Sequence, residues 1–231
     1  MTNEEFSNEF DALISSNAIA KPFGLGNTPL EFDEYEKSMF LTKAQETVIK
    51  SLYNGTLVGE AFEKTEELRR YLSNLVKTYS TTQQTTGIGL TEESYFFSIP
   101  EDTWFITYES VESSDDKLGC AKGTIMEVVP VSQDEFYKTK RNPFRMPNKR
   151  RVLRLDIKDN IVELVSVYTI DKYTIRYIAE PKPIILSTLP KELSINKLTT
   201  ETKCELNPAL HRTILEMAVN LAIKSRANVG K

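Results

Sequence analysis

The sequence feature that most constrains the fold is a pair of prolines that separates a strand-like segment from an apolar run. Arg176-Tyr177-Ile178 is followed by Glu180-Pro181-Lys182-Pro183 and then by Ile184-Ile185-Leu186. Proline fixes the backbone angle φ and has no N–H to donate, so two prolines this close together cannot lie inside a paired sheet. The segment therefore marks the point at which a β region returns the chain to helices.

Four stretches show the spacing of apolar residues that is typical of helices. Thr2 and Glu5 form a capping box for a short first helix that frays by residues 15–17. Thr28-Pro29 is the expected start of a second helix, and Asn54-Gly55 is its expected end. A third helix is expected over residues 60–79, paired with the second as an antiparallel hairpin. The last helix is expected over residues 207–226, where it would pack back on that hairpin.

Six stretches rich in β-branched and aromatic residues predict an antiparallel β domain, either a sandwich or a partial barrel. They are separated by turn signals, of which Asp159-Asn160 is the clearest hairpin turn. The stretches are 95–97, 103–111, 125–131, 151–157, 161–169 and 173–178.

The expected fold class is α+β: a helical bundle, made of an N-terminal helical hairpin plus a C-terminal helix, with an inserted antiparallel β domain. Residues 1–80 and 204–231 would form the helical body. Residues 81–94 would be a linker, 95–186 the β domain and 187–203 a connecting segment.

Composition places the chain among ordinary globular proteins. Of its 231 residues 40% are hydrophobic and 27% are charged, and the formal net charge is -4. No apolar run approaches the roughly 18 residues that a membrane span needs, so no membrane is expected among the partners. The acidic N-terminus lacks the features of a signal peptide. Cys120 and Cys204 lie far apart, and we expect reduced thiols in a cytoplasmic setting.

The single histidine, His211, removes most catalytic layouts built on imidazole, including multi-histidine metal sites. We expect it to be a partly buried structural or interface residue, with a pH switch or a ligand role as the alternative. Gly24-Leu25-Gly26 and Gly87-Ile88-Gly89 do not continue into a phosphate-binding loop.

Asp171, Glu180 and Lys182 superficially match the carboxylate and lysine arrangement of metal-dependent nucleases. That chemistry needs the Glu and the Lys on one continuous strand, and Pro181 and Pro183 interrupt the strand there. The chain is therefore expected to be no enzyme, with no catalytic residue, no cofactor and no metal.

A run of basic residues from Lys138 to Arg154 contains no acidic residue, although the chain as a whole is acidic. Phe136, Tyr137 and Phe144 lie within or beside it. Such a segment suits docking on an acidic protein neighbour, because arginine forks and an aromatic anchor form binding hot spots. It also suits nucleic acid, through phosphate contact and base stacking, and a solvated loop face is the third interpretation. The predicted partner-binding residues are Lys138, Lys140, Arg141, Phe144, Arg145, Lys149, Arg150 and Arg151.

Three blocks of sequence resemble virion proteins of tailed phages of the crAss-like group. The first is Tyr35-Glu36-Lys37-Ser38 with Phe40-Leu41-Thr42-Lys43-Ala44-Gln45-Glu46. The second is Asn142-Pro143-Phe144-Arg145-Met146-Pro147 with Arg151-Val152-Leu153-Arg154-Leu155. The third joins Arg176-Tyr177-Ile178 and Pro181-Lys182-Pro183-Ile184-Ile185-Leu186 to Cys204-Glu205-Leu206 and Leu210-His211-Arg212-Thr213-Ile214-Leu215. It is the order of the blocks that carries the resemblance.

The resemblance implies a ring protein of the head-to-tail connector. Such a protein would attach below the portal, form a cyclic ring around the DNA channel, expected to be a dodecamer, and bind the adjacent tail or ring proteins. Genomic DNA would pass without sequence recognition. The protein would be assembled in the bacterial host cytoplasm and lie in the virion. The alternative function is a nucleic-acid-binding module that uses residues 138–154.

Overall fold

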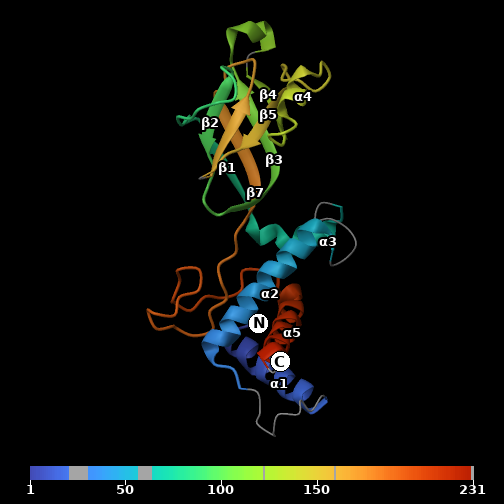
Figure 1. Ribbon diagram of the computed structural model, residues 1–231, viewed down its shortest axis with the longest axis vertical. Coiled ribbons are helices and arrows are strands. Elements are labelled where there is room, and N and C mark those ends of the chain that lie inside the picture. The colour runs from blue at the N-terminus through green and yellow to red at the C-terminus, as the bar shows by residue number, and fades with distance from the viewer. Residues whose placement is uncertain (21–30, 57–63, 122, 159, 230–231) are drawn as a thin grey trace. The chain divides into compact units, whose positions relative to one another are not determined.

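The computed structural model describes residues 1–20, 31–56, 64–121, 123–158 and 160–229, and it divides the chain into two compact units. One unit comprises Met1–Leu75 and Pro181–Lys231 and contains the long helices (Figure 1). The other comprises Val76–Glu180 and contains the sheet. The α+β fold class, with a sheet inserted between helical segments, is confirmed.

The helical unit is built around helix α2, whose two ends are defined by local sequence. Asp33 caps its N-terminus and forms a capping box with Glu36, and Gly55 ends it in the left-handed conformation with φ 74°. The expected end is therefore confirmed, whereas the expected start at Thr28-Pro29 lies outside the described residues. The helices of this unit are α1 (Asn3–Ala20), α2 (Glu34–Asn54), α3 (Glu66–Leu72), η1 (Ser73–Leu75), η3 (Pro208–Leu210) and α5 (His211–Val229).

Helix α2 packs mainly against α5, and α1 packs against both. The prediction of a helix over residues 60–79 is wrong in its extent, because the helical part of that segment ends at Leu75. The main partner of α2 is α5 and not α3. Helix α1 is also longer than the short helix expected. The apolar faces of the three long helices meet in a common core. Its fully buried side chains include Phe6, Phe10, Leu41, Val48, Ile49, Leu52, Ile214 and Leu215.

A row of polar side chains on α2 pairs with the backbone of the buried segment that follows the two prolines. Ser38 Oγ accepts a hydrogen bond from the N–H of Leu186 (3.0 Å), and Thr42 Oγ1 accepts one from the N–H of Ile184 (3.1 Å). Gln45 Nε2 donates to the carbonyl of Lys182 (2.8 Å). All three polar side chains are buried. Buried backbone groups without partners are costly, so this row, which we call the α2 polar ladder, allows an irregular segment to lie in the core.

The other edge of the same segment is paired as well. Ile185 forms a bridge with Thr202, and its carbonyl also accepts a hydrogen bond from Asn3 Nδ2 (3.0 Å). Pro181 and Pro183 have no backbone N–H. They therefore add no buried donor that would need an acceptor in this environment. The segment is therefore held on both sides without being part of a sheet.

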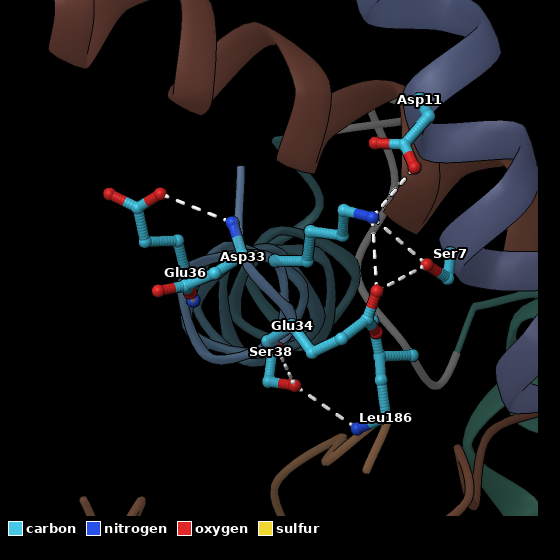
Figure 2. A network of polar contacts seen from close by, with 8 residues as sticks. Ser7, Asp11, Asp33, Glu34, Glu36, Ser38 and Leu186 are labelled. Carbon is cyan, nitrogen blue, oxygen red and sulfur yellow. Dashed lines mark hydrogen bonds and ion pairs between the residues drawn. The ribbon is translucent and has the colours of Figure 1, made fainter. Parts of the chain in front are cut away.

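A second polar cluster joins α1 to α2 around Lys37, whose side chain is 5% exposed. Lys37 Nζ lies 2.7 Å from Asp11 Oδ2, 3.0 Å from Glu34 Oε1 and 3.0 Å from Ser7 Oγ. Figure 2 shows these acceptors converging from the two helices. Burial opposes the charge of Lys37, but the hydrogen bonds and charges of Asp11 and Glu34 outweigh it and raise its pKa.

The sheet unit is one curled seven-stranded sheet with the order β1-β7-β3-β4-β5-β6-β2. Its concave core includes Phe97, Met126, Val152, Leu164 and Tyr173, which are buried on one face. Asn160 adopts φ 56° in the turn between β5 and β6, which confirms that hairpin. The strands are β1 (Val76–Thr81), β2 (Ser94–Ser98), β3 (Thr103–Ser113), β4 (Thr124–Pro130), β5 (Arg151–Asp156), β6 (Ile161–Val165) and β7 (Lys172–Ala179).

Two expectations about the sheet are wrong. Val76–Thr81 is not the end of a helix but the edge strand β1, which pairs with β7 from Val76↔Ile178 to Thr81↔Tyr173. The sheet is also not wholly antiparallel, because β4 and β5 run parallel. A parallel pair needs a long crossover connection, and here residues 131–150 supply it.

The boundaries of the units also differ from those expected. Residues 76–80 belong to the sheet unit, and residues 181–186 belong to the helical unit. Of the expected linker, residues 81–94, Thr81 lies in β1 and Ser94 in β2, and Thr85 bridges Phe96 of the edge strand β2. Residues 187–203 continue as irregular chain with an internal bridge between Ile195 and Leu198.

The α2 polar ladder predicts a specific loss of stability. Thr42→Val keeps the shape of the side chain but removes the acceptor of the Ile184 N–H, so we expect the free energy of unfolding to fall by about 1–3 kcal/mol. Thr47→Val is the matched control, because Thr47 is exposed on the same helix and its hydroxyl donates, among the described residues, only to the Lys43 carbonyl. It should change stability by less than about 0.5 kcal/mol. Urea unfolding followed by circular dichroism measures both, and equal losses would contradict the ladder.

Candidate functional site

The basic run forms the crossover between the parallel strands β4 and β5. It consists of helix α4 (Phe136–Arg141), a turn region and the first residue of β5, and we call residues 136–151 the basic arm. Phe136 is fully buried against Leu153, Leu155 and Val165, so the start of the arm is fixed on the sheet. In Figure 1, α4 lies beside β4 and β5.

The rest of the arm is shaped by asparagine turns and one arginine. Asn142 Oδ1 accepts from the N–H of Phe144, and Asn148 Oδ1 accepts from the N–H of Arg150, each at 2.9 Å. Arg151 Nη1 donates to the carbonyl of Phe144 (2.8 Å), and Pro147 is buried. The arm therefore has a defined conformation, which reduces the entropy that a partner would have to remove on binding.

The arm presents cations and one aromatic ring to the outside. Within the described residues, no ion pair involves its five exposed basic side chains: Lys138, Arg141, Arg145, Lys149 and Arg150. Phe144 is 89% exposed, and Tyr137 is 53% exposed. An exposed aromatic ring, close in sequence to arginines that have no ion-pair partner among the described residues, is a combination typical of binding hot spots.

Two of the predicted partner-binding residues also serve the arm itself. Lys140 Nζ lies 3.0 Å from Glu93 Oε2, so this lysine ties α4 to the segment before β2. Arg151 is half-buried and holds the Phe144 carbonyl. Sequence reasoning missed Glu93, and the sequence contains no signal for it, because 47 positions separate the two residues.

Arg154, the last cation of the basic run, lies outside this surface. Its side chain is 10% exposed, and its Nη1 lies 2.5 Å from Oε1 of the buried Glu109. Tyr173 donates to the other oxygen of Glu109 (2.7 Å). Burial raises the pKa of Glu109, which the adjacent guanidinium opposes. Arg154 is therefore a core ion-pair residue of the sheet unit.

The single histidine is part of the helical core. His211 is 5% exposed, its Nε2 lies 3.1 Å from the Leu206 carbonyl, and its Nδ1 lies 2.7 Å from the amino nitrogen of Met1. Burial lowers the pKa of His211, which favours the neutral ring. This environment agrees with the structural role expected for it.

Two other residues considered for chemistry, Asp171 and Lys182, have structural partners. Asp171 accepts a hydrogen bond from the N–H of Ser114, and Lys182 pairs with Glu205 at 2.9 Å. Burial raises the pKa of the Cys204 thiol to about 11, while the Cys120 side chain lies outside the described residues. The part of the chain that the structure describes contains no group of three His, Cys, Asp or Glu that could hold a metal ion. No helix in it is long and apolar enough to cross a membrane.

Comparison with known proteins gives one consistent result. Residues 1–231 match the model of the phage tail ring protein 3/4 family. The chain is 54% identical over 233 residues to Ring protein 3 of Bacteroides phage crAss001, with 99% of this chain and 98% of the relative covered. It is 32% identical over 234 residues to Ring protein 4/5 of the same phage, with 96% and 92% covered.

The division between surface and core arginines can be tested directly. Arg154→Met leaves Glu109 buried without its partner, so we expect the free energy of unfolding to fall by about 3–5 kcal/mol. Arg141→Met, in the exposed part of the arm, should change it by less than about 0.5 kcal/mol. Urea unfolding of both variants decides the point. If the Arg154→Met variant is as stable as the wild type, the assignment of Arg154 as a core ion-pair residue is contradicted.

Proposed function

We propose a function from one premise: the chain belongs to the phage tail ring protein 3/4 family. It is accordingly a structural component of the virion and not an enzyme. The finer proposal is that copies of the protein form a cyclic ring, a dodecamer, in the head-to-tail connector. There the ring would surround the DNA channel below the portal and link the capsid portal to the tail. Its assembly would take place in the host cytoplasm.

The observation that carries this proposal is the basic arm. A ring subunit needs a surface that recognises its neighbours. The arm is preorganised and exposed, and five of its seven basic side chains are exposed and have no ion-pair partner among the described residues. Arg141, Phe144 and Arg145 are close in sequence, from the end of α4 into the turn that follows it. There they would anchor an adjacent subunit, the portal or the next tail or ring protein.

The overall charge supports the proposed position around DNA. A channel that lets DNA slide must not bind phosphates tightly, and the net charge of -4 agrees with weak contact rather than recognition. DNA would then pass through the ring without being read.

A nucleic-acid-binding module is the second candidate function, because the same arm combines exposed cations with the exposed rings of Phe144 and Tyr137. Titration of the purified protein with short DNA at several salt concentrations separates the two. A steep fall of affinity with salt would support DNA binding through phosphates, and no binding at low salt would dismiss it.

Replacing the three anchor residues should prevent assembly without unfolding the subunit. In the variant Arg141→Ala/Phe144→Ala/Arg145→Ala we expect self-association and portal binding to be lost, because all three side chains are exposed and none supports the core. Light scattering and a portal pull-down measure assembly, and circular dichroism with thermal unfolding verifies the fold. Unchanged assembly would remove the arm from the proposed function.

A further inference from the structure

We propose that the basic arm of one subunit docks on the exposed acidic face of helix α1 in a second copy of this chain, in a head-to-tail contact. The inference rests on the proposed function, since it takes ring assembly as its setting. It goes further by naming the surface that receives the arm.

Helix α1 is an acidic helix without a single basic residue. Asn3–Ala20 contains Glu4, Glu5, Glu9 and Asp11, while its other face buries Phe6 and Phe10 in the helical core. All four carboxylates are exposed. At the helical angle of about 100° per residue they lie within an arc of about 160° on the side away from Phe6 and Phe10.

Two of these carboxylates form contacts within the subunit, and for the other two the described residues supply no ion-pair partner. Asp11 pairs with Lys37, and Glu5 accepts a hydrogen bond from the N–H of Thr2. For Glu4 and Glu9 the described part of the chain supplies no ion-pair partner. Unpaired charges of one sign on a rigid helix create a local negative field that attracts a basic surface.

The other helices of the helical unit are less suited to bind the basic arm. Helices α2, α3 and α5 each carry acidic and basic residues together. On α3, for example, Glu66 pairs with Arg70 at 2.9 Å, so the negative charge of this helix is partly neutralised by its own basic residue. Among these helices, α1 alone presents only negative charge.

The arm and α1 also have complementary charge and side chains that could pack together. Residues 136–151 contain seven basic residues and no acidic one, whereas the rest of residues 76–180 contains 16 acidic and 7 basic residues. The arm is thus the one basic segment of an acidic unit. Phe144 is exposed and lies between Arg141 and Arg145 in sequence, and Ala12, Ser15 and Ser16 on the exposed side of α1 are small enough for a ring to lie against. Charge complementarity would set the register, and the ring would add apolar contact.

We infer that the partner is a second copy of this chain, because the basic arm and the acidic face of α1 both occur on one chain. The arm and α1 are different surfaces, so a single arm–α1 contact between two copies is heterologous. It leaves the acidic face free on one copy and the arm free on the other. Repetition of such a contact closes into a ring when the rotation between neighbours permits it. An isologous contact, by contrast, would stop at a dimer.

Charge exchange tests the pairing. Arg141→Glu/Arg145→Glu and Glu4→Lys/Glu9→Lys should each weaken self-association of the full chain at least ten-fold, and the quadruple variant should restore it. Lys191→Glu/Lys203→Glu is the matched control, since it reverses two exposed lysines elsewhere. Sedimentation velocity at about 0.05 and 0.5 M NaCl measures the association, which should weaken as salt screens the charges.

The outcomes separate this inference from the proposed function. A wild-type protein that stays monomeric at every concentration, both alone and with the portal, would contradict ring formation itself. Assembly that survives both reversals would overturn only the pairing of arm with α1. Loss of assembly in both reversals without restoration in the quadruple variant would show that each surface binds something else.

A disulfide trap identifies which copy is bound. Ala12→Cys/Arg145→Cys keeps Phe144 and the other cations, and mild oxidation should give a ladder of covalent multimers on a non-reducing gel. The two single variants control for reaction with Cys120 and Cys204. A product confined to the monomer would show that the arm binds α1 of its own chain, and no product would contradict the contact.

Discussion

The structure depends on how a buried, irregular segment obtains hydrogen-bond partners. Ile184 and Ile185 are fully buried, yet the two prolines before them exclude them from a sheet. The α2 polar ladder on one side and Thr202 on the other supply the missing partners. Because Asn3 bonds to the same segment, this arrangement also joins α1 to α2 and fixes where the chain re-enters the helical unit after the sheet.

Local patterns predicted the features that local physics determines. The proline pair ends the β region, Gly55 ends α2, and Asn160 turns the β5–β6 hairpin, each because of its own backbone preference. Strand β1 was missed because the helical spacing of Leu68, Leu72 and Leu75 continues into Val76 and Tyr79. What makes Val76–Thr81 a strand is its pairing with β7, which is distant in sequence.

In the candidate site, too, contacts between residues distant in sequence could not be predicted. The basic run and its aromatic residues could be found from sequence, and their exposure follows from their place in a crossover between parallel strands. The role of Arg154 could not be found, since only the fold brings it to the buried Glu109. A run of like charges in sequence is thus divided by the strand β5 into a surface that can bind and a residue that stabilises the core.

The central claim is that this family member assembles through its own surfaces into a ring. The most direct measurement is the mass of the purified protein by light scattering, together with electron micrographs of the protein alone and mixed with the portal. We expect one closed ring with a fixed number of copies. A monomer at every concentration, both alone and with the portal, would contradict the account.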